Sequence, residues 1–69
     1  MGAKYEHGSE SYINEFAAAE HLKLSVHTLR GMRRDKKGPR YTKFGRAVRY
    51  RTSWLDAWAE LNSVDPLAA

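Results

Sequence analysis

A short run of basic and polar residues, Ser25 to Arg34, carries the clearest chemical pattern in the chain. It opens with serine, a residue that commonly caps helices, and it predicts one short helix. At about 100° per residue, Leu29 and Met32 fall on one side with Val26 at its margin. The other side carries His27, Arg30, Gly31 and Arg34. One side of this helix therefore needs a hydrophobic core, and the other suits an anion.

Positive charge is concentrated between Arg30 and Arg51. This segment holds ten Lys/Arg and one acid, Asp35, a balance of +9, whereas the rest of the chain holds two lysines and seven acids. The net charge of +4 therefore hides a strongly basic half. Concentrated like charge repels itself unless a polyanion compensates it, which favours nucleic acid or an anionic surface as the partner.

Length and composition predict one small domain with a thin core. A chain of 69 residues buries a limited share of its surface, and we expect aromatic residues to supply most of what is buried. The absence of cysteine excludes disulfides and thiolate metal sites and favours a reducing compartment. The sequence shows no apolar run of membrane-spanning length and no signal-like region. These features predict a cytoplasmic protein with no membrane partner.

Three helices and a hairpin must position the basic residues. The first helix is predicted from Glu15 to about Leu22, capped by Asn14. Lys23-Leu24 is long enough only for a tight turn before the helix that Ser25 caps, which is predicted to end around Asp35. Two helices joined this closely form a helix-turn-helix.

A β-hairpin is predicted after the basic loop Lys36-Lys37-Gly38-Pro39. Its strands are Arg40 to Phe44 and Ala47 to Arg51, around a turn at Gly45-Arg46. Alternation along the strands leads us to expect one set of side chains in the core: Thr42, Phe44, Val48 and Tyr50. The set expected to point outward is Tyr41, Lys43, Arg49 and Arg51.

The last predicted helix opens at Thr52-Ser53, where Ser53 and Asp56 approximate a capping box. Its apolar stripe, which we interpret as core, consists of Trp54, Leu55, Trp58 and Leu61. The predicted organisation is a disordered lead-in over 1–11, a folded domain over 12–62 and a short tail over 63–69.

The order of these pieces resembles the winged helix-turn-helix of the excisionase family, which is related to the DNA-binding domains of MerR-type regulators. The segments that carry the resemblance are Glu15-Phe16-Ala17-Ala18 with Leu22, Leu24 to Leu29, Gly38-Pro39, Phe44-Gly45-Arg46 with Val48-Arg49-Tyr50, and Ser53 to Trp58. The resemblance covers residues 12 to 61. It implies an α+β fold of three helices and a two-stranded wing. It also implies sequence-specific binding of recombination-site DNA by a small phage or mobile-element protein that bends DNA and directs an integrase toward excision.

The residues expected to contact DNA form two groups. A major groove admits a helix, and side chains near its N-terminus reach the base edges, where Arg30 can contact guanine and Val26 a thymine methyl. Gly31 costs about 1 kcal/mol in a helix relative to alanine, and we interpret it as permitting close approach to the DNA backbone. The recognition-helix group is Ser25, Val26, His27, Thr28, Arg30, Gly31 and Arg34.

The second group lies in the loop and wing. Arg46, at the hairpin tip, suits a narrow minor groove, and the other members suit phosphates. This group is Lys36, Lys37, Arg40, Lys43, Arg46, Arg49 and Arg51. The expected partners are double-stranded DNA with attachment-site repeats, an integrase of the tyrosine recombinase class, and further protomers on adjacent sites.

The sequence supports alternative functions to different degrees. His7, His21 and His27 lack the carboxylates and spacing of a metal or acid-base site, so no enzyme activity, metal or cofactor is expected. A small transcriptional regulator of the AlpA type would use the same domain and stays open as an alternative. A protein-interaction adaptor with an acidic partner is a less favoured one. An effector-sensing MerR regulator and a terminase small subunit are disfavoured because their additional segments are not recognised after residue 61.

Overall fold

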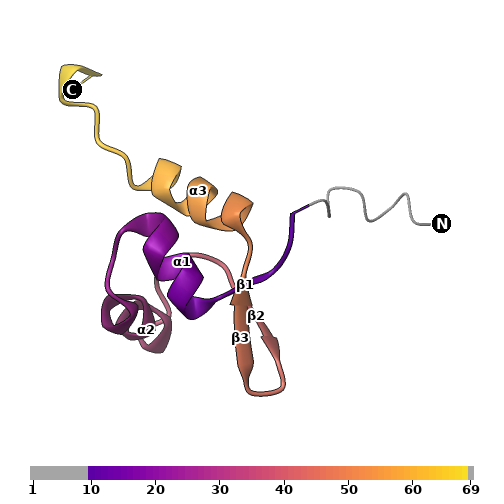
Figure 1. Ribbon diagram of the computed structural model, residues 1–69. Coiled ribbons are helices and arrows are strands. Elements are labelled where there is room, and N and C mark those ends of the chain that lie inside the picture. Colours follow the sequence, from indigo (N-terminus) through magenta and orange to yellow (C-terminus); the bar gives the residue numbers. More distant parts are fainter. Residues whose placement is uncertain (1–9, 69) are drawn as a thin grey trace.

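Three helices and a three-stranded sheet make an α+β fold in the computed structural model, which describes residues 10–68 (Figure 1). The elements in chain order are β1 (Ile13–Asn14), α1 (Glu15–Leu22), α2 (Val26–Arg34), β2 (Thr42–Phe44), β3 (Ala47–Tyr50), α3 (Thr52–Leu61) and a 3-10 turn (Pro66–Ala68). The β2–β3 hairpin extends away from the helices as a wing (Figure 1). The predicted winged helix-turn-helix is confirmed.

The helix-turn-helix forms where the capping residues predict it. Asn14 Oδ1 accepts a hydrogen bond from the amide of Ala17 at 2.9 Å, and Ser25 Oγ accepts one from Thr28 at 3.0 Å. The chain leaves α1 through Lys23, whose φ of 58° is left-handed. This geometry closes the tight turn and lets α2 start within four residues of the end of α1.

The core is built from small and aliphatic side chains around one tyrosine. The buried hydrophobic residues that form it are Ala18, Ala19, Leu29, Tyr50 and Leu55. The expectation that aromatic residues supply most of the core is therefore wrong: Phe16 is 59% exposed, Phe44 is 52% exposed, and both tryptophans are only half-buried. The alanines of α1 let neighbouring elements approach closely, which leaves little space for larger rings.

The strand register corrects the predicted faces of the hairpin. Phe44 pairs with Ala47, Lys43 with Val48 and Thr42 with Arg49. Because directly opposed residues share a face, Thr42 and Phe44 lie on the face of Arg49, away from Tyr50. A two-residue turn pairs even positions with odd ones here, so Thr42 and Phe44 cannot share the core face of Val48 and Tyr50.

A short strand that the sequence did not predict completes the sheet. β1 pairs antiparallel with β3 through Ile13 and Tyr50 and through Asn14 and Arg49, giving the order β1-β3-β2. The segment before α1 therefore covers an edge of the hairpin that would otherwise be unpaired. The wing is rooted in a three-stranded sheet.

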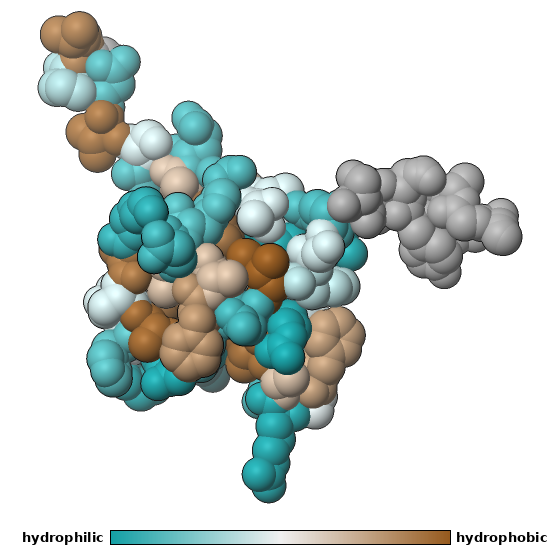
Figure 2. Space-filling model, in the orientation of Figure 1, coloured by the Kyte–Doolittle hydropathy of each residue, from teal (hydrophilic) through white to brown (hydrophobic). Residues whose placement is uncertain are grey.

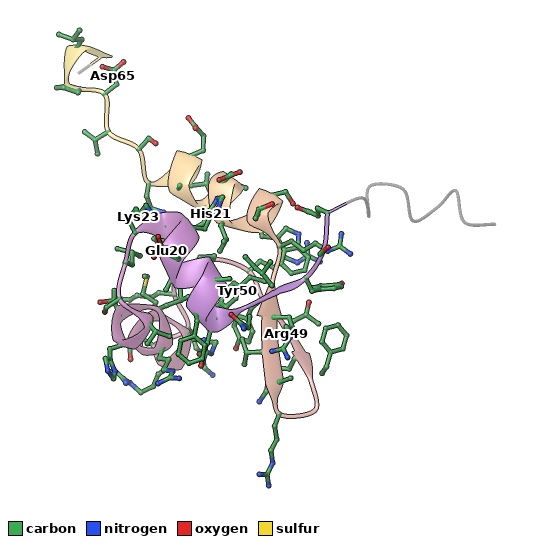
Figure 3. The ribbon with its side chains drawn as sticks, viewed as in Figure 1. Glu20, His21, Lys23, Arg49, Tyr50 and Asp65 are labelled. Atoms are coloured by element: carbon green, nitrogen blue, oxygen red, sulfur yellow. The ribbon has the colours of Figure 1, made fainter. Side chains whose placement is uncertain are left out.

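The start of α3 differs from the predicted capping box. α3 begins at Thr52, and its cap comes from Glu10: Glu10 Oε1 accepts from the amide of Ser53 at 3.0 Å, and Oε2 accepts from the Ser53 hydroxyl at 2.6 Å. Asp56 Oδ1 instead lies 2.8 Å from Nε2 of His21, a contact that joins α3 to α1. Figure 3 labels His21 beside α3. The carboxylate of Glu10, distant in the chain, takes the place of the local Asp56 because β1 brings residue 10 beside α3. Most of the expected lead-in, residues 1–9, lies outside the described residues.

Candidate nucleic-acid interface

The outer side of α2 presents the polar residues that its helical spacing predicts. His27, Thr28, Arg30 and Arg34 are exposed, whereas Leu29 on the opposite side is fully buried. α2 and the wing lie on the same lower part of the molecule (Figure 1), where hydrophilic side chains at the lower left and at the tip of the wing alternate with hydrophobic ones (Figure 2). This helix can therefore enter a groove while its inner side remains in the core.

Arg30 does not extend freely into solvent. Its Nη2 donates to Glu15 Oε2 at 2.6 Å and its Nε donates to the same oxygen at 3.1 Å. The carbon at the centre of its guanidinium lies 5.5 Å from the centre of the Phe16 ring. Both partners belong to the first turn of α1, so the first helix fixes the orientation of a side chain on the second.

Arg33 connects the same carboxylate to the core. Its Nη2 donates to Glu15 Oε1 at 3.0 Å, and its Nη1 donates to the Tyr50 hydroxyl at 3.0 Å. Burial alone would lower the pKa of Arg33, but the hydrogen bonds with Tyr50 and Glu15 outweigh it and raise that pKa. The pKa of Glu15 is held below its ordinary value, chiefly by the hydrogen bond from Arg30, so its carboxylate is charged at neutral pH.

A hollow of about 390 Å³ lies between α1, α2 and the wing. Three arginines are among the residues that line it, Arg33, Arg46 and Arg49, together with the start of α1. Its walls therefore come from the recognition helix and from the wing, the two parts expected to hold DNA.

The tip of the wing carries an exposed arginine on an open turn. Gly45 has a φ of 64°, with no atom within 4 Å of where its Cβ would lie, and Arg46 beside it is exposed. Lys43 is exposed on β2. Arg49 is half-buried, and its Nη1 donates to the carbonyl of Val48 at 2.9 Å. The wing thus presents positive charge at its tip and along its sides.

Arg51 corrects the expected outward set. Its guanidinium lies 4.5 Å from the centre of the Tyr12 ring and 5.5 Å from that of Trp54, with Nη1 3.9 Å from Glu10 Oε2. Its side chain is therefore largely covered, because it packs between two rings and a carboxylate. Arg40 is exposed but stacks on Trp54 at 4.6 Å. Arg51 is therefore held within the fold and is not among the proposed DNA contacts.

The loop after α2 is shaped by two residues with positive φ. Lys36 has a φ of 59° and Gly38 one of 86°. A Cβ at Gly38 would lie 3.0 Å from the Cβ of Met32, so the loop turns tightly against the end of α2. Lys36 and Lys37 are exposed on this turn, directly after the recognition helix.

Within residues 10–68, no three His, Cys, Asp or Glu side chains gather in a way that could hold a metal ion. No helix among these residues is long and apolar enough to cross a membrane.

Comparison with protein families agrees with this geometry. The model of a helix-turn-helix domain matches residues 17–63, which include all of α1 but its first two residues, and the whole of α2, the wing and α3. The chain belongs to the helix-turn-helix domain family. This family includes excisionase-like proteins and is typically non-enzymatic, and its domain implies that the protein binds DNA. A search of curated proteins finds no match to the chain.

Sequence reasoning missed Glu15 and Arg33 as parts of this helix-turn-helix surface. In the sequence, Glu15 is recognisable only as the first residue of the first predicted helix, and no local pattern assigns a role to Arg33. The signal available was the spacing of Arg30 and Arg33, which places two cations on adjacent positions of one helix side, together with the acid at the start of the preceding helix. Only the contacts between the two helices in the folded chain show that these residues meet.

Proposed function

We propose that this protein binds a specific DNA sequence by placing α2 in a major groove and the wing against the adjacent minor groove. The observation that supports this proposal most directly is the hollow lined by Arg33 of α2 and by Arg46 and Arg49 of the wing. This hollow joins α2 and the wing in one surface. Ser25, Val26, His27, Thr28, Arg30, Gly31 and Arg34 form the proposed helix contacts. Lys36, Lys37, Arg40, Lys43, Arg46 and Arg49 form the proposed loop and wing contacts.

Contact with two adjacent grooves also favours a bend in the DNA. Closing the duplex around α2 and the wing brings more phosphates within reach of the basic loop and hairpin, which offsets the elastic cost of bending. Arg46 stands on an exposed tip, where a guanidinium can enter a narrow minor groove. Arg46→Ala should therefore weaken binding and reduce the bend, as measured by circular-permutation gel shift. Glu60→Ala, far along α3, is the matched surface control.

The biological role that we propose is excisionase. In this role the protein binds repeated sites in the attachment region of a phage or mobile element, several protomers side by side, and directs a tyrosine recombinase toward excision in the cytoplasm of the host. The support is the family match together with the resemblance of the α1, α2 and wing motifs to excisionases. An AlpA-type transcriptional regulator shares this domain and is the second candidate.

Footprinting separates the two roles. Duplex DNA from the attachment region and from the element's promoters is probed for protected bases, first with the protein alone and then with integrase added. Protection of direct repeats beside integrase sites, with stimulated excision in a purified reaction, supports the excisionase role. Protection confined to a promoter, with no effect on excision, supports the regulator. Equal weak affinity for every duplex, falling steeply with salt, would contradict specific recognition altogether.

A further inference from the structure

The carboxylate of Glu15 holds two arginines of the recognition helix from a position outside it. Glu15 begins α1, and its side chain is only 17% exposed. One oxygen accepts both hydrogen bonds from Arg30, and the other accepts the bond from Arg33. A paired, largely covered carboxylate of this kind orients its partners, because each hydrogen bond restricts the rotamers that they can adopt.

The orientation imposed on Arg30 leaves a defined set of donors for DNA. A guanidinium has five N–H donors in a rigid fork. Glu15 takes the side of the fork formed by Nε and Nη2, and Phe16 covers one face. The hydrogens at the far end, on Nη1 and the second position of Nη2, are the pair that can reach two acceptors of one base. Guanine offers such a pair, O6 and N7, in the major groove.

The network is fixed to the core rather than to a mobile surface. Arg33, which shares Glu15 with Arg30, donates to the hydroxyl of Tyr50, and Tyr50 is 1% exposed. Figure 3 shows Tyr50 where β3 meets α1. Hydrogen bonds therefore run from a buried tyrosine through Arg33 and Glu15 to the exposed Arg30.

We propose that Glu15 is a specificity-determining positioning residue, which presets Arg30 so that the Nη1–Nη2 end of its guanidinium reads one guanine. This inference rests on the proposed DNA-binding function of α2. It assigns to the first helix a share in base discrimination, although that helix need not touch a base. Removing the Glu15 charge would make the protein more basic and still poorer at choosing its site.

The test compares affinities for two duplexes. One is selected by the native protein from randomised DNA, and the other is its scrambled counterpart. Glu15→Gln keeps the shape of the side chain and removes its charge. Glu20→Gln is the matched control, because Glu20 is on the same helix, pairs with Lys23 and is 76% exposed. Both affinities are measured on one preparation of each variant. A loss of folded protein therefore lowers both apparent affinities by the same factor and cancels in their ratio.

We expect Glu15→Gln to lower the selected-to-scrambled affinity ratio roughly tenfold, the size of one bidentate base contact, and Glu20→Gln to preserve it. Arg30→Ala should lower the ratio by a similar factor, and adding Glu15→Gln to it should cause no further loss. Repeating the selection with Glu15→Gln should relax the same base position that Arg30→Ala relaxes.

Three results would overturn the inference. Equal gains in affinity for both duplexes would mean that Glu15 only competes with DNA for Arg30. An unchanged ratio would mean that Arg30 needs no positioning. A further loss in the double variant would mean that Glu15 acts through a different residue. If the native protein selects no sequence at all, the proposed function fails together with the inference, whereas the first three results leave that function standing.

Discussion

Glu10 caps a helix that begins 42 positions later, since its carboxylate accepts hydrogen bonds from the Thr52 hydroxyl and from both the amide and the hydroxyl of Ser53. These bonds satisfy donors at the start of α3 that the local sequence leaves without a side-chain cap. Glu10 therefore joins the residues directly before β1 to the start of the last helix.

Replacing Glu10 should destabilise the protein in a pH-dependent manner. The hydrogen bonds from the side chain and backbone of Ser53 hold the pKa of Glu10 below its ordinary value of 4.5. Its stabilisation is therefore complete above the unfolded-state pKa and is lost as the pH falls through the lowered folded-state pKa. Glu10→Ala should lower the melting temperature at about pH 7 and differ less from the native protein at about pH 3.

A control for this cap is Glu60→Ala, which removes an acid from the exposed C-terminal part of α3. Thermal unfolding of the two variants followed by circular dichroism checks the prediction. An equal loss of melting temperature in both, or a Glu10→Ala loss that grows as the pH falls, would contradict it.

Gly31→Ala should separate stability from DNA binding. A Cβ at this position would lie 3.4 Å from Arg34 Nη2, the end of a flexible side chain that is 75% exposed, so the free protein can accommodate it. Alanine should raise the free energy of unfolding by about 1 kcal/mol through helix propensity. If the backbone of α2 closely approaches DNA, the added methyl group should weaken binding. Urea unfolding and gel shift check the two effects, and unchanged affinity would rule out the close approach.

Gly38→Ala should be costly, because Gly38 combines a φ of 86° with a site where Cβ would meet Met32. We expect a loss of about 1 to 3 kcal/mol in the free energy of unfolding. Gly45→Ala is the matched comparison, since that residue also has positive φ but open space around it. Urea unfolding should show the larger loss for Gly38→Ala; equal losses would show that contact with Met32 contributes nothing.

Arg49→Ala and Arg51→Ala should have opposite signatures. Arg49→Ala should reduce affinity similarly for all sequences and lower the slope of log affinity against log salt by about 0.9, the value for one phosphate contact. Arg51→Ala should leave that slope unchanged and reduce the free energy of unfolding by about 1 kcal/mol, because Arg51 packs on Tyr12 and Trp54. Salt-titrated anisotropy and urea unfolding distinguish them; a lower salt slope for Arg51→Ala would restore it to the DNA contacts.

Local chemistry predicted the elements well. Asn14 and Ser25 cap α1 and α2 as expected, and Gly45-Arg46 forms the turn of the wing. These signals depend on a residue and its near neighbours in the chain, so the sequence alone carries them.

Relationships between distant segments were not predictable in the same way. The faces of the hairpin followed from the register, which the predicted turn length could have supplied. β1, the Glu10 cap and the Glu15 contacts depend on how α1 and the sheet pack, which no local pattern encodes. For the same reason two arginines expected to point outward are held by distant acids. Arg30 is held by Glu15, 15 positions earlier, and Arg51 by Glu10, 41 positions earlier.

The short strand before α1 also bears on how this module can be transplanted. The family match begins at residue 17, yet β1 pairs with the wing, and Glu10 and Glu15 lie ahead of that boundary. A chimera that exchanges only the matched span would receive α2 without Glu15, the hydrogen-bond partner of Arg30, and without the strand that pairs with the wing. The transferable unit therefore begins at Glu10, and swaps made there should carry site preference between relatives intact.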